Sequence, residues 1–200
     1  MINRKLTYLS LMVITFACFH MAFSGTITGK VKARGAKNGG NAVIYIDKIP
    51  GKIFTPPKKH ALMDQIGLTF KPHVLPVLVG TTVDFLNSDA VMHNVYSPDE
   101  CAGKFNLGSW PKGHTKPYTF TVPGCAATLL CNVHPEMEAF VVVVETPYYA
   151  VSDEKGDFQI PDVPPGEYTL RIWHERLKGK EVQIAVPEKS DVVANFEIKR

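Results

Sequence analysis

The chain has 200 residues, of which 45% are hydrophobic and 20% are charged, and its formal net charge is +3. This length suits one domain of ordinary size or two small ones, and the composition excludes a disordered, collagen-like or polytopic membrane protein. Without its first 24 residues the chain keeps 20 basic and 19 acidic residues. Net charge therefore gives no reason to expect a nucleic acid or an anionic lipid as a partner.

The first residues have the pattern of a secretory signal peptide. Arg4 and Lys5 precede a long apolar run, which ends in Ala22-Phe23-Ser24 with small residues at the two positions that a signal peptidase reads. We therefore expect residues 1–24 to be removed from a periplasmic or secreted protein. An uncleaved membrane anchor is one alternative, and a lipoprotein acylated at Cys18 is another. No other stretch is apolar enough to span a bilayer, so we expect no stable membrane insertion after cleavage.

The rest of the sequence shows no helix-length amphipathic pattern. Its apolar and β-branched runs are short and are separated by Gly, Pro, Asn and Asp, which predicts many strands and an all-β fold. Residues 141–144 are four consecutive valines, as expected of a strand that is buried on both faces. We predict strands at residues 25–32, 42–46, 67–71, 74–79, 82–87, 93–96, 118–122, 127–131, 139–145, 157–160, 167–173, 180–186 and 192–199.

Three segments of the chain differ in pattern. Residues 25–62 hold two predicted strands and a stretch rich in Gly, Lys and Pro. Residues 63–146 hold most of the His and Cys residues. Residues 147–200 contain Asp153-x-x-Gly156-x-Phe158 and then Pro164-Pro165-Gly166-x-Tyr168, which predicts a β-hairpin.

The segment Cys131-Asn-Val-His134-Pro-Glu-Met137 lies between two predicted strands, and His93 lies 38 residues upstream of Cys131. One thiolate, two imidazoles and a thioether form a soft ligand set that suits a single mononuclear copper ion, which can be Cu(I) or Cu(II). The thiolate stabilises Cu(I), imidazole binds both oxidation states, and a long axial thioether bond tunes the reduction potential. The predicted metal ligands are therefore His93, Cys131, His134 and Met137.

Other kinds of site fit the sequence less well. Cys-x-x-His alone could be half of a zinc site, but a structural zinc site usually has another Cys or His close by. Haem attachment needs Cys-x-x-Cys-His, and a binuclear copper loop needs a second Cys a few residues from Cys131. The sequence contains no His-Glu-x-x-His, Gly-x-Ser-x-Gly or P-loop motif, and we do not expect an enzyme.

Loss of the signal peptide leaves three cysteines in an oxidising compartment, where thiols tend to pair. If Cys131 binds the metal, the implied disulfide joins Cys101 to Cys125. The alternative is that these two residues are free, buried thiols.

Several separated motifs, in the right order, look like those of the cupredoxin family. The short ligand loop is most similar to that of amicyanin and related plastocyanin-like proteins, and the resemblance covers residues 63–146. It implies a Greek-key β-sandwich, a mononuclear blue copper centre and outer-sphere electron transfer. The motifs are Phe70-x-Pro72, Val79-Gly80-Thr81-Thr82-Val83, Phe85-x-Asn87, His93-Asn94-Val95, Phe120-x-x-Pro123-Gly124 and Cys131-x-x-His134-x-x-Met137.

The resemblance also implies a role for each matching residue. His93, Cys131 and His134 would be the equatorial ligands and Met137 the axial one. Asn94 matches the residue that forms hydrogen bonds around the ligand cysteine and ties two loops together, which is a supporting role around the metal.

The same resemblance implies an exposed edge at the metal centre. His134 would be the partly exposed ligand through which electrons pass, with Met92 and Pro135 in a docking patch around it.

Two positions depart from the family pattern. Leu129 stands where the family often has an aromatic residue, and Ala139 stands where it often has Gly. Neither change removes a ligand, but both leave the axial geometry open. Glu136 or Glu138 could supply an oxygen ligand in place of the thioether.

The other histidines have less informative surroundings. His60, His73 and His114 lie in stretches rich in Lys or Pro, where we expect surface roles rather than a second metal site. His60 with Met63 could form a weak secondary copper contact. For His174, beside a tryptophan, we expect packing or a surface role.

Residues 147–200 resemble part of the carboxypeptidase regulatory-like, or transthyretin-like, β-sandwich. Such domains usually begin with two strands that look like Gly25-Thr-Ile-Thr-Gly-Lys-Val31 and Asn41-Ala-Val-Ile-Tyr-Ile46. We therefore expect the first and last segments to fold together, with the copper-binding domain of residues 63–146 inserted between them. The rival arrangement is a cupredoxin over residues 25–146 followed by a small appended domain.

These observations predict a periplasmic blue copper protein that transfers single electrons. Its partners would be redox proteins such as a dehydrogenase and a c-type cytochrome, and the second β-sandwich would be a scaffold or docking module. The alternative is a copper-binding protein that stores or delivers copper without redox turnover.

Overall fold

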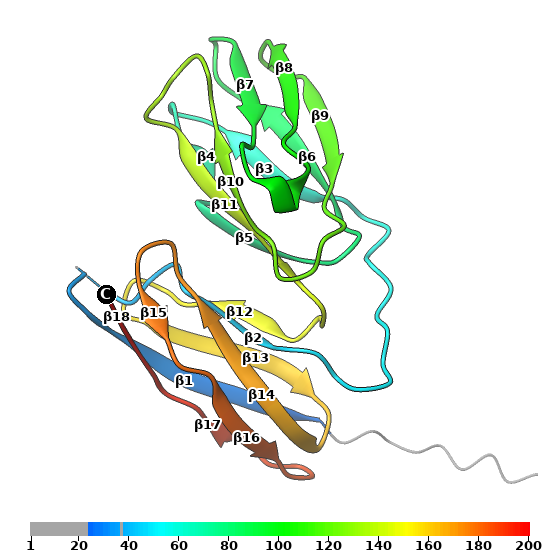
Figure 1. Cartoon of the computed structure of the whole chain (residues 1–200), viewed down its shortest axis with the longest axis vertical. Coiled ribbons are helices and arrows are strands. Elements are labelled where there is room, and N and C mark those ends of the chain that lie inside the picture. The colour runs from blue at the N-terminus through cyan, green and yellow to red at the C-terminus, as the bar shows by residue number, and fades with distance from the viewer. Residues whose placement is uncertain (1–23, 37) are drawn as a thin grey trace, which may run out of the picture.

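The computed structural model describes residues 24–36 and 38–200 (Figure 1). These residues form eighteen strands and one short 3₁₀ turn, η1 (Glu100–Ala102), so the predicted all-β fold class is confirmed. In these two ranges no helix is long and apolar enough to cross a membrane. The predicted signal peptide, residues 1–24, lies outside the described residues apart from its last position.

A first sandwich is built from the middle of the chain. Its five-stranded sheet has the order β5-β11-β10-β7-β8, and its four-stranded sheet has the order β4-β3-β6-β9. The two sheets enclose a core that contains Met63, Phe85, Leu129 and Met137. The strands are β3 (Ala61–Gln65), β4 (Phe70–Lys71), β5 (Val74–Leu78), β6 (Thr82–Asn87), β7 (His93–Tyr96), β8 (Asn106–Trp110), β9 (Thr115–Thr119), β10 (Ala126–Leu130) and β11 (Glu138–Val144).

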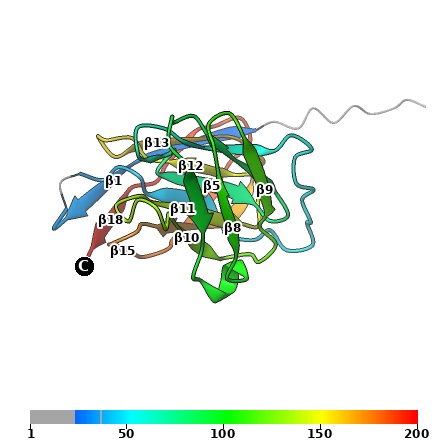
Figure 2. The same cartoon turned by 90° about the horizontal axis from the view of Figure 1, so that it is seen from above.

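A second sandwich combines the two ends of the chain. One sheet has the order β13-β1-β18-β15, with β17 also paired to β1, and the other has the order β12-β2-β14-β16. The two sandwiches are stacked along the long axis of the molecule (Figures 1 and 2). The strands are β1 (Gly25–Arg34), β2 (Val43–Ile46), β12 (Tyr149–Val151), β13 (Asp157–Val163), β14 (Gly166–Trp173), β15 (Lys178–Gly179), β16 (Val182–Val186), β17 (Val192–Val193) and β18 (Phe196–Lys199).

Strands β1 and β2 pair only with strands from the last segment of the chain, among them β13 and β14. This pairing is what the insertion hypothesis requires. That the first and last segments fold together as one domain, with residues 63–146 as an inserted domain, stays a prediction. The first sandwich begins slightly earlier than the expected boundary, because Ala61 and Leu62 already pair with β6.

Most predicted strands are present, but several differ in position or were missed. The predicted strand at 67–71 is reduced to β4, and the strand predicted at 118–122 lies instead at Thr115–Thr119. Strands β3, β8, β12 and β15 were not predicted. In β3 the inward residue Gln65 is polar, and β8 is a largely exposed edge strand, so neither shows the apolar alternation of a buried strand.

Prolines occupy three strands, and all three are edge strands. Pro76 lies in β5, Pro117 in β9 and Pro161 in β13, each at the end of its sheet. Proline has no N–H to donate, so it is tolerated where one side of the strand has no partner.

Strand β11 forms the wall between the two sandwiches. Val141 and Val143 belong to the core of the first sandwich. On its other face, Phe140, Val142 and Val144 pack with Val43 and Val74 and contact partly buried residues of the second sandwich, including Trp173. The run of valines is thus buried on both faces, as the sequence predicted.

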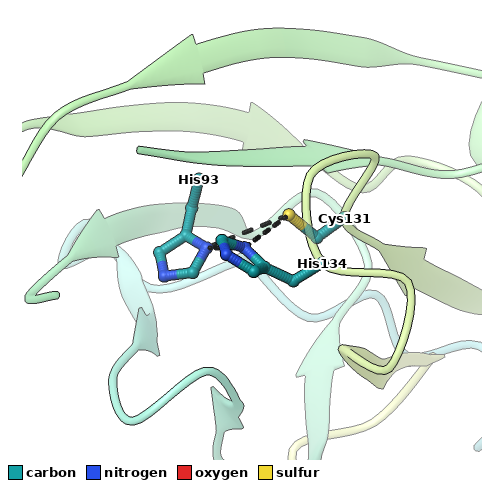
Figure 3. A group of neighbouring side chains, drawn as sticks. All are labelled: His93, Cys131 and His134. Atoms are coloured by element: carbon teal, nitrogen blue, oxygen red, sulfur yellow. Dashed lines mark hydrogen bonds between the residues drawn. The ribbon is translucent and has the colours of Figure 1, made fainter. Parts of the chain in front are cut away.

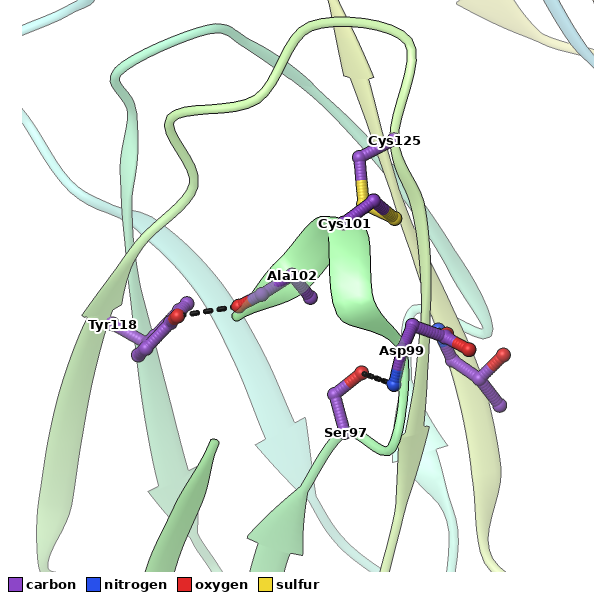
Figure 4. Close-up of a disulfide and its surroundings, with 7 residues drawn as sticks. Ser97, Asp99, Cys101, Ala102, Tyr118 and Cys125 are labelled. Carbon is purple, nitrogen blue, oxygen red and sulfur yellow. Dashed lines mark hydrogen bonds between the residues drawn. A yellow bond between two sulfur atoms is a disulfide. The ribbon is translucent and has the colours of Figure 1, made fainter. Parts of the chain in front are cut away.

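The predicted disulfide between Cys101 and Cys125 is confirmed (Figure 4). Cys101 lies in η1, and Cys125 immediately precedes β10, so the bond attaches the β7–β8 connection to the five-stranded sheet. Two hydrogen bonds support the same turn: Tyr118 Oη donates to the carbonyl of Ala102, and the N–H of Thr128 donates to the Asp99 carboxylate at 2.6 Å.

The double variant Cys101→Ala/Cys125→Ala should unfold more easily than the native protein. The disulfide joins residues 24 positions apart. Such a bond typically stabilises a domain by about 2 to 4 kcal/mol, largely because it restricts the conformations of the unfolded chain. Urea unfolding of the metal-free proteins measures this difference. Cys131→Ser is the control, since it removes a buried thiol without breaking a disulfide. Equal urea midpoints for the native protein and the double variant would contradict the prediction.

Candidate metal centre

Two of the four predicted ligands lie at the ends of neighbouring strands, and the other two follow in the adjoining loop. His93 is the first residue of β7, and Cys131 directly follows β10, which pairs with β7 through Leu130 and Tyr96. His134 and Met137 lie in the loop between β10 and β11. Pairing of β7 with β10 therefore brings residues that are 38 positions apart in sequence to the same end of one sheet.

The side chains of His93, Cys131 and His134 point toward a common centre (Figure 3). The Cys131 Sγ atom lies 3.9 Å from His93 Nδ1 and 4.0 Å from His134 Nδ1, and the two Nδ1 atoms are 3.1 Å apart. A point in the plane of these three atoms lies about 2.1 Å from each, close to ordinary metal–nitrogen and metal–sulfur bond lengths of about 2.0 to 2.3 Å. The triangle therefore fits a single metal ion without movement of the side chains.

The three residues differ in their access to solvent. His93 is 0% exposed and Cys131 is 2% exposed, whereas His134 is half-buried. A buried thiol and a buried imidazole exclude water from most of the site, and His134 is the residue that connects the site with the surface.

Asp89 fixes the orientation of His93. Its carboxylate lies 2.8 Å from His93 Nε2, on the side of the ring opposite to the Nδ1 atom that faces Cys131. It also accepts hydrogen bonds from the backbone N–H groups of Gly67 and Leu68 at 2.7 and 3.0 Å. Partial burial favours the neutral acid, but the hydrogen bonds from Leu68, Gly67 and His93 outweigh it and lower the pKa of Asp89 to about 2. The resulting carboxylate holds the proton on Nε2 and leaves Nδ1 free to bind a metal.

Asn94 connects the three segments around Cys131. Its side-chain N–H groups donate to Asn106 Oδ1 at 2.8 Å and to the carbonyl of Gly108 at 2.9 Å. Its side-chain oxygen accepts from the N–H of Asn132 at 3.2 Å, and its own backbone N–H points at Cys131 Sγ at 3.5 Å. The motif resemblance implied that this residue supports the ligand cysteine, and that role around a bound metal stays a prediction.

Within the ligand loop, Met137 is buried and its two acidic neighbours are not. Met137 is 1% exposed and belongs to the first core, while the residues on either side, Glu136 and Glu138, are exposed. The backbone N–H of Met137 donates to the carbonyl of His134 at 3.0 Å and closes the turn. Burial thus favours the thioether over either carboxylate as an additional ligand.

The other histidines in the part of the chain that the structure describes lie apart from this cluster. His60 is exposed and pairs with Asp84 at 2.9 Å, and His114 is exposed in the β8–β9 connection. His73 differs from the expected surface role: it lies at the boundary of the two sandwiches, 3.2 Å from both the carbonyl of Glu138 and the carboxylate of Glu175.

Sequence reasoning did not identify Asp89 or the boundary position of His73. Asp89 lies four residues before His93 in the β6–β7 loop, a spacing that has no special meaning outside a helix. Its role depends on the backbone of residues 67 and 68, which reaches it only through the pairing of β3 with β6.

With this geometry in view, the chain can be compared with known proteins. A family model for the carboxypeptidase regulatory-like domain matches residues 135–199, less than half of the chain. This range includes β11, which pairs within the first sandwich, and it omits β1 and β2, which pair within the second. A comparison with curated protein sequences gave no match.

Similar solved structures include amicyanin, a purple cupredoxin and a nitrite reductase. A Cu(I) form of an amicyanin mutant is 28% identical with a TM-score of 0.41, and the likeness covers 44% of this chain and 84% of that one. The purple cupredoxin from Nitrosopumilus maritimus is 26% identical with a TM-score of 0.38, covering 42% of this chain and 98% of that one. The copper-containing nitrite reductase from Thermus scotoductus is 26% identical with a TM-score of 0.40, covering 50% of this chain and only 25% of that one.

These structural neighbours and the matched family model are of the two kinds that the sequence motifs predicted. TM-scores below 0.5 do not by themselves establish a shared fold, so the case for the metal centre depends on the triangle of ligand atoms in this protein.

Asn94→Ala should destabilise the metal-free protein. The substitution removes the hydrogen bonds of a buried side chain to exposed partners, and each such loss costs about 0.5 to 1.5 kcal/mol. Urea unfolding of the apoprotein measures the effect. Asn132→Ala is the matched control, because that exposed residue keeps the backbone N–H that Asn94 binds; an Asn94→Ala protein as stable as this control would show that the network contributes nothing.

Proposed function

We propose that the protein is an exported electron carrier that binds one copper ion through His93, Cys131 and His134, with Met137 as the axial ligand. The observation that carries this proposal is the triangle of two imidazole nitrogens and one cysteine sulfur at distances that one ion can bridge. Two imidazole nitrogens and a thiolate around one ion, with the buried thioether of Met137 as the proposed fourth ligand, form the set that favours copper over zinc, calcium or magnesium.

When bound, copper would supply a one-electron couple between Cu(II) and Cu(I). The protein would hold its ligands in one geometry for both states, because His93 is fixed by Asp89 and the Cys131 loop is fixed by Asn94. A site that does not rearrange exchanges electrons with little reorganisation. Burial of Cys131 and His93 keeps water and other ligands away from the metal.

Exposed apolar side chains lie on the loops that carry or support the His-Cys-His cluster. The site-face patch consists of Leu68, Val91, Met92 and Val133, whose exposed fractions are 42%, 45%, 50% and 49%. It lies on the loops that carry or support the ligands, since Leu68 binds Asp89 and Val133 adjoins His134. Exposed apolar side chains suit docking with redox proteins, for which a dehydrogenase as donor and a c-type cytochrome as acceptor are the proposed examples.

The runner-up is a protein that stores or delivers copper without redox turnover. Delivery requires ligand exchange with a partner, and two of the three clustered ligands are buried here. This burial favours the carrier. We also propose that the protein is not itself an enzyme; steady consumption of a small molecule by the copper-loaded protein would contradict that part of the proposal.

The copper-loaded protein should be intensely coloured. One equivalent of Cu(II) should produce a strong visible absorption band, because the Cys131 thiolate donates charge to Cu(II), and the protein should show a reversible one-electron couple. Cys131→Ser should lose the band, while His114→Ala, which changes an exposed histidine outside the cluster, should keep it. A colourless protein that retains only Cu(I) would favour the delivery function instead.

Electron exchange between two copies of the copper protein tests the site-face patch. Val133→Lys places a positive charge on the patch of each molecule, and repulsion of about 1 kcal/mol should slow self-exchange about fivefold at low salt. Val193→Lys is the matched control, since Val193 is 72% exposed on β17 in the second sandwich. Line broadening in NMR spectra of mixed oxidised and reduced protein gives the rate. Equal rates for the two variants would place the electron-transfer surface elsewhere.

A further inference from the structure

One histidine of the first sandwich, His73, contacts both the second sandwich and the segment that follows Met137. His73 lies in the short connection between β4 and β5 of the first sandwich. Its Nδ1 atom is 3.2 Å from the carbonyl oxygen of Glu138, and its Nε2 atom is 3.2 Å from a carboxylate oxygen of Glu175 in the β14–β15 loop. We refer to His73, Glu138 and Glu175 as the clasp.

Backbone and ring contacts strengthen the attachment of His73 to β11. The carbonyl of His73 accepts a hydrogen bond from the N–H of Phe140 at 2.9 Å. The His73 ring also packs edge-on against the Phe140 ring, with centroids 5.5 Å apart, and Phe140 in turn contacts Trp173 at 5.3 Å. His73 thus contacts Glu138 and Phe140, the first and third residues of β11, which begins directly after Met137.

The second sandwich supplies the other half of the clasp. Glu175 is only 15% exposed, and its second carboxylate oxygen lies 3.4 Å from Arg176 Nε. In Figure 1 the β14–β15 loop, drawn in orange, rises from the second sandwich toward the first. The carbonyl of Glu138 and the carboxylate of Glu175 are both acceptors, so both contacts are hydrogen bonds when each ring nitrogen of His73 carries a proton.

We propose that His73 is a positioning residue, through which the second sandwich holds Met137 at its distance from the metal. This inference rests on the proposed copper centre and goes beyond a scaffold or docking role for the second sandwich. Met137 is joined to Glu138 by one peptide bond, so a change in the clasp contacts shifts the position of the Met137 thioether. The axial ligand tunes the reduction potential of such a centre, so the second sandwich sets that potential.

Substitutions at Glu175 test the clasp without touching a metal ligand. The axial bond stabilises Cu(II) more than Cu(I). Glu175→Ala in the full-length, copper-loaded protein should weaken this bond and therefore raise the reduction potential. A threefold change in the ratio of the Cu(I) and Cu(II) dissociation constants is about 28 mV for one electron. The visible spectrum of the Cu(II) form should change at the same time.

Three further variants separate positioning from charge and from folding. Glu175→Gln loses the charge but keeps a hydrogen-bonding group, so it should stay close to the native potential. Glu197→Ala removes the same charge from another ion pair of the second sandwich, with Arg34, and should have no effect. His73→Asn keeps a donor for the Glu138 carbonyl but cannot reach Glu175, so it should behave like Glu175→Ala.

Amide hydrogen exchange in the metal-free protein provides an independent readout. Exchange at the N–H groups of Met137 and Phe140 should be faster in Glu175→Ala and His73→Asn than in the native protein and in Glu197→Ala. The clasp is overturned if Glu175→Ala matches Glu197→Ala in both potential and exchange, or if Glu175→Gln shifts the potential as much as Glu175→Ala. A native protein that gives no visible band with Cu(II) would refute the copper centre instead, and the exchange measurement would still test the clasp.

Discussion

Burial of β11 on both faces is the constraint on which the metal centre depends. Val141 and Val143 point into the first core, and Val142 and Val144 point toward the second sandwich. The strand begins directly after Met137 and pairs with β10, which ends directly before Cys131. Both ends of the ligand loop are therefore attached to strands that cannot shift without opening a packed interior, and close-packed interiors resist such shifts.

Polar contacts complete what the apolar packing begins. The metal centre places His93 and Asn94 in the interior, where a polar group without a partner is costly. Asp89, in the β6–β7 loop, and Asn106, the first residue of β8, provide those partners. These polar contacts hold in place the segments that carry His93 and Cys131.

The sequence was sufficient where a chemical role is concentrated in a short motif. Cys131-x-x-His134 between two strand predictions located the ligand loop, and the apolar run of β11 correctly indicated burial on both faces. The sequence was insufficient where the pairing of distant strands determines which residues meet. Gln65 faces inward although it is polar, which hid β3, and Asp89 meets His93 only because the backbone at residue 67 is brought beside it.

His73 shows the same limit at the level of domains. Its neighbours in sequence, among them Lys71 and Pro72, are typical of an exposed loop, and the side chain is indeed 36% exposed. Its partner Glu175 is 102 residues away and belongs to the other sandwich. Contacts between two units are determined by their docking, and no local pattern of either unit encodes them.

The way the two sandwiches dock leaves the proposed electron-transfer surface open. The second sandwich covers the outer face of β11, where its Trp173 packs against Phe140 of the first sandwich. Met92 and Val133 nevertheless stay about half exposed with the whole described chain in place. A module that served only as a cap for the metal would bury these residues. The docking therefore separates two tasks: the second sandwich contacts the protein behind the ligand loop, and the apolar patch beside His134 remains available to another molecule.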